Sequence, residues 1–540
     1  MRLVRGCIWL CALVLPGALS VAVRAATGNY LDLYEASILE LQTGMEKNQF
    51  TSVDLAYLAR IDEVNLKGAK LRAVIEANPS ALRQAAALDD ERKKSGKRSL
   101  LHGIPILLKD NIATLASEGM NTTAGSSALL KSVVPGDATV AAKLRKAGAI
   151  LLGKANLSEW AHFRGNVASG WSGRGGQATS PYYPGADPCG SSSGSGVATA
   201  VGLAAGSLGT ETDGSIVCPS SYNNLVGIKP TVGLTSRSGV IPISSHQDTV
   251  GPMTRSVEDG AVILSVIAGR DSKDNYTSTV PSVIPDYTKY LNTNAIRGKR
   301  FGVPRAVFTE DRFTGNDPYI NVAFNKSLET IRSLGGVIVD PADLPSASEI
   351  VASNNETFVL SVDFKIELNE YLKSLKSIPT GVSTLAKLVA YNDAHKDLEE
   401  PKGYEDQSTL IESQSTTGYN STYYAALQAD YDLGRTRGID AVLKSYNLDA
   451  IVLPSNVPLG FFPNDTKVTP GSAGPNTVYP APGAPFGLAF LGTAYSEPSL
   501  ISFAYAYEQK THTRLKRRAY AAAVPRTQLK DVIHDPGLAH

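Results

Sequence analysis

The stretch from residue 190 to residue 220 reads GSSSGSGVATAVGLAAGSLGTETDGSIVCPS. It opens with a loop rich in Gly and Ser that contains Ser191, and a second serine, Ser215, follows 24 residues later. Between these serines, residues 198–205 are small and apolar, which predicts a tightly packed, buried helix. Two serines therefore flank an element that is expected in the core. The small residues around Ser215 leave room for backbone amides to approach a bound group.

Apolar runs before this stretch predict a sheet. Residues 103–108 read GIPILL and end at Lys109, which is the pattern of a buried strand. Residues 139–146 have apolar residues at helical spacing, and residues 149–152 form the next apolar run. Strands that alternate with helices are typical of a sheet covered by helices. The sequence therefore predicts an α/β fold.

Further helices are predicted along the rest of the chain. Helical spacing of apolar residues recurs over residues 34–41, 52–64, 310–445 (with polar breaks) and 500–508. Thr51 followed by Asp54 is typical of a capping box, and residues 449–453 are again strand-like. Neither an internal repeat nor a linker-like stretch divides the chain. We therefore expect a single large domain.

The composition excludes several classes of protein. The chain has 540 residues, of which 43% are apolar and 19% charged, as in globular proteins. Its formal net charge is +1, without a basic block, so we expect no nucleic-acid partner. Beyond the N-terminus, no apolar run approaches the length of about 18 residues that a membrane-spanning helix needs. We therefore expect no stable membrane insertion.

The first 25 residues predict a secretory signal peptide. Arg2 and Arg5 precede an apolar run, and small residues at Val23 and Ala25 fit cleavage after Ala25. The alternative is an uncleaved membrane anchor, which the short, interrupted run disfavours. We expect the mature chain, residues 26–540, to be secreted.

Secretion would determine which cysteines remain in the mature chain and would expose asparagines to glycosylation. Cys7 and Cys11 would leave with the signal peptide. Cys189 and Cys218 could pair in an oxidising compartment, and the sequence leaves this open. The N-x-S/T pattern marks seven candidate glycosylation sites: Asn121, Asn156, Asn275, Asn325, Asn355, Asn420 and Asn464. Asn156 follows an apolar strand, so we expect it to be buried and without a glycan.

Two short motifs resemble known sites but have the wrong context. Residues 148–154 nearly match a phosphate-binding loop, yet Ala155 replaces the hydroxyl residue that would hold magnesium. Residues 190–194 match G-x-S-x-G around Ser192, yet prolines before them exclude the strand that a nucleophile elbow needs. We predict neither site. Structural roles are expected for three histidines: His102, His162 and His246.

Lys109, Ser191 and Ser215, in this order and at this spacing, resemble the amidase signature enzymes. The matching segments span nearly the whole mature chain and include residues 103–111, 153–156, 227–231, 251–253 and 487–508. The sequence of residues 210–219 is most similar to that of the bacterial peptide amidase branch. The resemblance implies one α/β domain with a central mixed sheet covered by helices.

The resemblance also implies roles for individual residues. Ser215 would be the nucleophile, Ser191 a bridging serine after a cis peptide bond, and Lys109 the base. The oxyanion hole would consist of four backbone N–H groups, those of Thr212, Asp213, Gly214 and Ser215. The implied domain covers residues 26–540, with its core over about residues 50–510 and a helical substrate-side region over about 310–445. The family needs no metal and no cofactor.

The chemistry of these residue types agrees with those roles. A serine hydroxyl is a weak nucleophile without an adjacent base, and a lysine is a base only when it is neutral. The reference pKa of lysine is about 10.4, so work near neutral pH requires a depression of roughly three units. Burial of Lys109 at the end of an apolar strand would lower its pKa. Ser191 could then pass a proton from Ser215 to Lys109.

Two positions depart from the family pattern. Val217 stands where many members have Arg, and Asp213 where many have Gly, which puts the substrate in doubt. We predict a secreted serine amidohydrolase that acts on small amides or C-terminally amidated peptides, as a monomer or homodimer. Esters are a further possible substrate class. The alternatives are a glutaminase-type amidotransferase subunit, which a signal peptide disfavours, and a catalytically silent binding protein.

Overall fold

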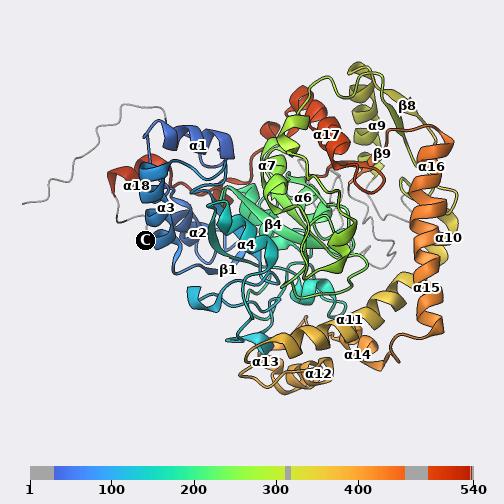
Figure 1. Ribbon diagram of the computed structural model, residues 1–540, viewed down its shortest axis with the longest axis horizontal. Helices are drawn as coiled ribbons and strands as arrows, with labels where there is room; N and C mark the ends of the chain where they lie inside the picture. Colours follow the sequence, from blue (N-terminus) through green and yellow to red (C-terminus); the bar gives the residue numbers. More distant parts are fainter. Residues whose placement is uncertain (1–29, 311–317, 456–484, 536, 538–540) are drawn as a thin grey trace, which may run out of the picture. The chain divides into compact units, whose positions relative to one another are not determined.

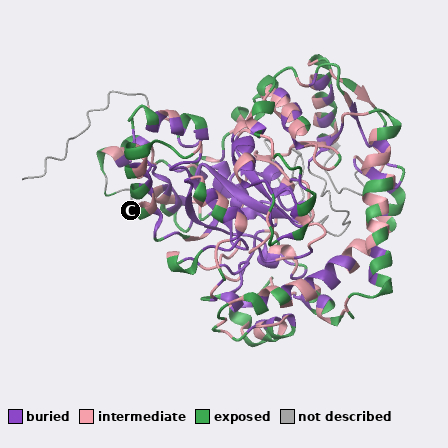
Figure 2. Cartoon of the chain, viewed as in Figure 1, coloured by how far each residue is buried: buried purple, intermediate pink, exposed green. Residues whose placement is uncertain are grey.

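Three parallel strands form the middle of a six-stranded sheet. β2 (Pro105–Lys109) pairs with β3 (Ile150–Ala155) on one side and with β4 (Gly206–Glu211) on the other. All three strands are buried along their whole length, and Figure 2 shows this region in purple. Strands covered on both faces need continuous apolar sequence, which explains the runs before Lys109 and over residues 150–152.

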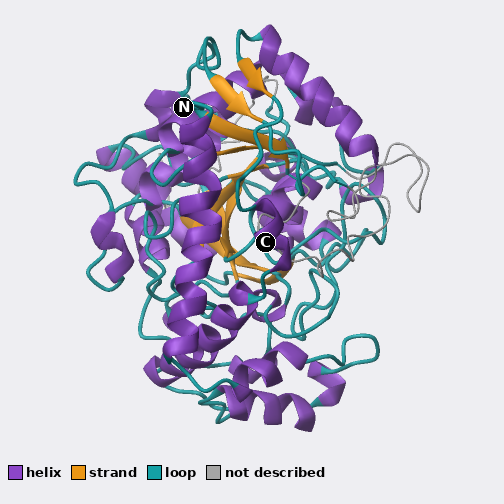
Figure 3. Ribbon diagram, turned by 90° about the vertical axis from the view of Figure 1, so that its right-hand side faces the viewer, coloured by secondary structure: helices purple, strands orange, loops and turns teal. Residues whose placement is uncertain are grey.

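Three antiparallel strands complete this sheet, whose order is β1-β3-β2-β4-β6-β5. β1 (Val74–Ala77) pairs with β3, β6 (Thr249–Thr254) pairs with β4, and β5 (Val226–Gly227) pairs with β6. The sheet is thus mixed, and helices flank its strands (Figure 3). Both expectations, the mixed sheet and its helical cover, are confirmed.

The computed structural model describes residues 30–310, 318–455, 485–535 and 537 (Figure 1). From Leu31 onward the chain forms one compact unit. The expected signal peptide, Cys7, Cys11 and the sequon at Asn464 lie outside the described residues. None of the helices in the described ranges is both long and apolar enough to cross a bilayer.

A second sheet of four strands was not expected. Its order is β10-β9-β7-β8, with β9 (Ala450–Pro454) between β10 (Leu488–Leu491) and β7 (Arg300–Gly302). β8 (Val337–Val339) pairs with β7 at the edge. Only β9 was predicted, over residues 449–453. β7 and β8 have three residues each, and three residues cannot establish a period of two.

Helices and short helical segments lie along the whole of the remaining described chain. The helices of the first half are α1 (Ile38–Glu46), α2 (Tyr57–Val64), α3 (Ala81–Ser95), α4 (Thr139–Lys146), α5 (Ser193–Ala200), α6 (Val217–Tyr222) and α7 (Val257–Ile267). Those of the second half are α9 (Pro318–Ser333), α10 (Ala347–Ala352), α11 (Asn355–Ser374), α12 (Leu385–Ala394), α13 (Lys396–Glu399), α14 (Ser408–Ser415), α15 (Ser421–Tyr431), α16 (Asp440–Ser445), α17 (Glu497–Thr511) and α18 (Leu529–His534). The short 3₁₀ turns are η1 (Ala116–Glu118), η2 (Ser127–Leu129), η3 (Glu159–His162), η4 (Asn275–Thr279), η5 (Tyr287–Tyr290), η7 (Thr513–Lys516) and η8 (Ala521–Ala523). η6 (Asp432–Ile439) is a π-helical segment between α15 and α16.

Most helix predictions are confirmed with shifts at the ends, and one is largely wrong. α4 has the predicted bounds, and α17 includes residues 500–508. α2 begins five residues later than predicted, at Tyr57, because the N–H and hydroxyl of Thr51 bond the Asp54 carboxylate in a separate turn. The helix predicted over residues 198–205 is wrong beyond residue 200: α5 spans Ser193–Ala200, and Gly202 follows with a φ of +69°, a left-handed conformation typical of helix ends.

The two ends of the described chain pack together. Arg60 of α2 is fully buried, and its guanidinium donates to the carbonyl of Gly202 at 2.6 Å and of Thr527 at 2.6 Å. The N–H of Leu33 donates to the side-chain oxygen of Gln528 at 2.9 Å. The C-terminal segment before α18 therefore completes the layer of N-terminal helices.

The long helix α11 belongs to the core of the domain. Its apolar residues Leu360, Phe364 and Leu368 share one buried cluster with Leu157 and Ile243. α11 also packs along α15. The helical region expected on the substrate side is therefore attached directly to segments that follow β3 and precede β6.

Candidate active site

Lys109 is the last residue of β2, and its side-chain amine is fully buried and hydrogen-bonded. Its Nζ lies 2.7 Å from the Oγ of Ser191, 2.9 Å from the Oγ1 of Thr210 and 3.1 Å from the carbonyl oxygen of Thr210. Lys109 and Ser191 are 0% and 1% exposed. β2 and β4 run in parallel, so their ends meet at one edge of the sheet and bring Thr210 beside Lys109.

The surroundings of Lys109 favour a neutral amine. Burial lowers its pKa to about 7, whereas the carboxylates of Asp248 and Glu211 act in the opposite direction. No acidic side chain within the described residues forms an ion pair with it at 4 Å or less. An amine with this pKa can both accept and return a proton near neutral pH.

Ser191 lies between the sheet and helix α5. The peptide bond between Gly190 and Ser191 is cis, as the family resemblance implied. The carbonyl of Ser191 accepts a hydrogen bond from the N–H of Ser158 at 3.0 Å. The neighbouring Ser192 bonds with the backbone of Thr210, so two successive serines bind the ends of adjacent strands, Ser191 at β2 and Ser192 at β4.

Ser215 lies in the turn between β4 and α6. The N–H of Ser192 donates to the carbonyl of Ser215 at 3.1 Å, which joins the two serine-bearing segments. Ser215 is 7% exposed. Among the described residues, none forms a hydrogen bond with its hydroxyl. The hydroxyl is therefore available to a bound molecule.

The same turn presents backbone donors. Within the described residues, no acceptor binds the N–H groups of Thr212, Gly214 or Ser215. The next two N–H groups, those of Ile216 and Val217, donate to the carboxylate of Glu211 at 2.6 and 2.9 Å. The Glu211 carboxylate thus occupies the start of α6, and the donors before it remain open to an anionic group.

Some residues of this site were not assigned a role from the sequence. Thr210 accepts from Lys109 and also from the Nδ2 of Asn111 at 3.0 Å. The hydroxyl of Thr212 donates to Asp248 at 2.6 Å. Thr210 and Glu211 stand next to the predicted turn, which could have drawn attention to them. Asp248 is 33 residues beyond Ser215, where only the strand pairing brings it close.

Cys189 and Cys218 form a disulfide, which the sequence left open. Cys189 precedes Ser191 by two residues, and Cys218 follows Ser215 by three. The disulfide therefore ties together the two segments that carry the serines.

We predict that the double substitution Cys189→Ser, Cys218→Ser destabilises the protein. The bridge closes a loop with a sequence separation of 29, for which chain entropy gives about 3 to 4 kcal/mol. A lower unfolding temperature of the variant, and of the wild type after treatment with dithiothreitol, would agree. Equal unfolding temperatures with and without reductant would contradict it.

The two motifs that we did not predict to be functional sites, residues 148–154 and 190–194, have structural roles. Residues 150–155 form β3, and the Nζ of Lys154 donates to the carbonyl of Ile112 at 2.6 Å and to the hydroxyl of Thr122 at 3.0 Å. Ser192, at the centre of G-x-S-x-G, bonds with backbone atoms of Thr210.

The histidines are engaged elsewhere. His102 bonds with the carbonyl of Leu88 at 2.9 Å, and His246 with the hydroxyls of Tyr423 and Tyr276 at 3.0 and 2.5 Å. Asn156 is buried as expected, and its amide donates to the carbonyls of Arg72 and Gly176.

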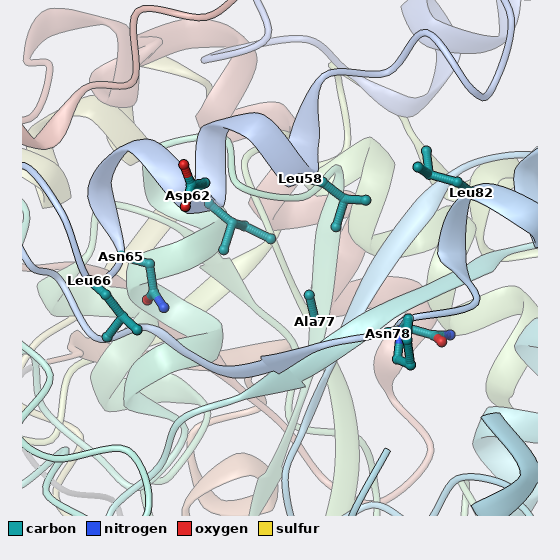
Figure 4. A pocket seen from close by; sticks show the side chains of 9 residues that line it. Leu58, Asp62, Asn65, Leu66, Ala77, Asn78 and Leu82 are labelled. Carbon is teal, nitrogen blue, oxygen red and sulfur yellow. The ribbon is translucent and has the colours of Figure 1, made fainter. Parts of the chain in front are cut away.

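A pocket of about 500 Å³ lies elsewhere, beside α2 and the edge strand β1 (Figure 4). Its lining is mostly apolar, and its amides are already bonded to backbone: Asn65 to Val74, and Asn78 to Leu151. It contains no arrangement of base and nucleophile. In the part of the chain that the structure describes, no group of three or more His, Cys, Asp or Glu side chains could hold a metal ion.

Comparison with known proteins gives consistent matches over most of the chain. The sequence profile of the family described as Amidase matches residues 53–479. A protein of Arthroderma benhamiae named "Putative amidase" is 41% identical, with 93% of this chain and 89% of that protein aligned. One subunit of the glutamyl-tRNA(Gln) amidotransferase of Geobacter metallireducens is 33% identical, with 90% of this chain and 99% of that protein aligned. The crystal structure of the peptide amidase of Stenotrophomonas maltophilia has a TM-score of 0.79 and 42% identity, and the alignment covers 90% of this chain and 98% of that one.

Proposed function

This chain belongs to the amidase family, and we propose that it hydrolyses carboxamides through an acyl-enzyme on Ser215. The observation that carries the mechanism is the 2.7 Å hydrogen bond between Ser191 and a fully buried Lys109. Burial lowers the pKa of this lysine to about 7, so a large fraction is neutral at neutral pH. A neutral amine bonded to a hydroxyl can accept its proton.

The proposed reaction has two halves. Ser215 gives its proton to Ser191, Ser191 gives its own to Lys109, and the Ser215 oxygen attacks the carbonyl carbon of the amide. The carbonyl oxygen becomes an oxyanion, which the N–H groups of Thr212, Asp213, Gly214 and Ser215 stabilise. The C–N bond then breaks, and the proton returns through Ser191 to the leaving nitrogen.

Hydrolysis of the acyl-enzyme repeats these steps with water. Lys109, neutral again, accepts a proton from water through Ser191 as the water oxygen attacks the ester carbon. The bond to the Ser215 oxygen breaks, Ser215 regains a proton, and a carboxylic acid leaves. Every proton moves between named groups of this chain, the substrate and water.

The substrate that we propose is a small amide or a C-terminally amidated peptide. The support is the likeness to a solved peptide amidase, at 42% identity over nearly all of that chain. A glutaminase-type amidotransferase component is the second candidate, because a relative named for that enzyme is about one-third identical. A binding protein without activity is the third, and an intact lysine and two serines argue against it.

We also propose that the protein is secreted and glycosylated, as a monomer or homodimer. The disulfide between Cys189 and Cys218 supports passage through an oxidising compartment, where such bonds persist. Asn275 and Asn420 are exposed in the described chain and are suitable glycan acceptors. Mass spectrometry of the protein from culture medium would reveal an N-terminus at residue 26 and glycans at these positions.

A substrate panel tests the activity. We expect ammonia release from amidated di- and tripeptides or small aliphatic and aryl amides, without any added partner or tRNA. We also expect a fluorophosphonate probe to label Ser215, which peptide mapping would locate. Hydrolysis of glutamine alone would favour the amidotransferase role. Absence of both turnover and labelling would favour the binding protein.

A further inference from the structure

Strand pairing brings Asp248 to the turn that carries Ser215. β4 and β6 are antiparallel, with Glu211 opposite Thr249, so the residues that follow and precede them, Thr212 and Asp248, meet at the same edge. The hydroxyl of Thr212 donates to the Oδ1 of Asp248 at 2.6 Å. Asp248 is 8% exposed, so this contact is largely shielded from water.

The second carboxylate oxygen of Asp248 is also bound. Its Oδ2 accepts the N–H of Ile243 at 2.8 Å and the N–H of Ser244 at 3.1 Å. The Asp248 N–H in turn donates to the carbonyl of Ser244 at 2.9 Å. Three donors therefore fix the carboxylate in one orientation, and that orientation fixes the side chain of Thr212.

Asp248 lies on the same side of the sheet edge as Lys109. Thr210 belongs to β4, and Thr212 directly follows the last residue of that strand. The Asp248 carboxylate is one of the charges that act to raise the pKa of Lys109. The Oγ1 of Thr210 bonds Lys109, and the Oγ1 of Thr212 bonds Asp248. The carboxylate is thus placed to act on the ammonium form of Lys109.

Each of the other charged groups near Asp248 either is paired with another residue or is acidic, as Asp248 is. Arg237 donates to the backbone carbonyl of Asp248, but its guanidinium is paired with Asp274. Glu367 accepts the N–H of Ser245, and its carboxylate has the same sign as that of Asp248. Within the described residues, Asp248 forms no ion pair at 4 Å or less.

We propose that Asp248 is a positioning residue for the amide hydrolysis proposed above, on which this inference rests. Through Thr212 it holds the turn whose N–H groups face the substrate, and its negative charge favours proton binding by Lys109. Burial raises the pKa of Asp248 to about 6, which lies below the pKa of Lys109 at about 7, so Asp248 is mostly charged at the midpoint of the Lys109 titration.

The substitution Asp248→Asn in the full-length protein separates these two roles. Asn keeps the shape, and its amide can still bond with Thr212 or with the loop N–H groups. We expect plateau kcat to fall about tenfold because the turn is less well held. We also expect the acid limb of the kcat/KM profile to move about one pH unit lower, because the charge that favours protonated Lys109 is gone.

Two further variants are matched controls. Thr212→Val removes the hydroxyl but keeps the charge, so its plateau should fall while its acid limb stays in place. Asp259→Asn removes another buried carboxylate, whose pKa burial also raises to about 6 and which accepts the N–H of Ile38, and we expect both the limb and the plateau to remain unchanged. If circular dichroism shows that the Asp248→Asn variant is unfolded, the pH profile is measured on Asp248→Ser instead. Asp248→Ser removes the same charge and leaves space for water.

An acid limb that coincides in Asp248→Asn and the wild type would overturn the proposal, whatever the plateau. The shift alone would support it, because a merely structural role does not alter the proton affinity of another residue. A wild-type protein without amide turnover or probe labelling would instead contradict the proposed function. The two failures are therefore distinguishable.

Discussion

Replacing Ser215 with alanine will lower kcat/KM for amide hydrolysis by a factor on the order of 10⁴ or more. The hydroxyl of Ser215 is the atom that would form the acyl-enzyme, and the neighbouring N–H groups cannot replace it. The substitution removes an oxygen that has no hydrogen-bond partner among the described residues, so the fold should be unaffected. Ammonia release and circular dichroism, measured on the same preparation, test both statements.

Ser195→Ala is the matched control for Ser215→Ala. Ser195 is a buried serine of α5 whose hydroxyl donates to the carbonyl of Leu208 at 3.1 Å. Its loss should cost about 1 kcal/mol of stability and leave turnover near the wild-type rate. More than a tenth of wild-type activity in Ser215→Ala, or equal losses in both variants, would contradict the assignment of the nucleophile.

Replacing Lys109 with methionine will lower kcat/KM by about 10³-fold or more. Methionine fills nearly the same space in this fully buried position but cannot accept a proton. Without the amine, the hydroxyl of Ser191 has no base to which it can give its proton. The matched control is Lys143→Met. Lys143 donates to three carbonyls, those of Ile267, Ala268 and Gly269, so its loss should reduce stability but not turnover.

The same lysine sets the expected pH dependence of the wild type. The pKa of Lys109 is about 7, and only the neutral form can accept the proton of Ser191. Below this value the ammonium form increases, so kcat/KM should fall about tenfold for each pH unit. A profile that stays flat down to pH 5 would show that Lys109 is not the base, even if Lys109→Met is inactive.

Sequence reasoning identified the centre of the site because local signals mark it. An apolar run ending in a lysine predicts a buried strand end, and the strand ends at Lys109. A loop rich in Gly and Ser marks the segment of Ser191, and the structure brings Lys109 and Ser191 into contact. The resemblance to the amidase signature enzymes supplied the roles, which spacing alone would not have distinguished from solvated residues.

The remaining features depend on contacts that no local pattern records. Asp248 reaches Thr212 only because β4 and β6 pair antiparallel with a particular register. The pairing of Cys189 with Cys218 depends on how the turn before α6 folds onto the loop before α5. Helix ends were misplaced where a turn residue, Gly202, decides the boundary.

The buried guanidinium of Arg60 has a consequence for how the domain unfolds. Its acceptors at Gly202 and Thr527 lie 142 and 467 residues further along the sequence. A buried donor without an acceptor is costly, so detachment of the segment around Thr527 would leave the guanidinium unsatisfied and destabilise α2. Release of that segment and loosening of α2 should therefore occur together, in one cooperative transition, rather than as separate fraying events.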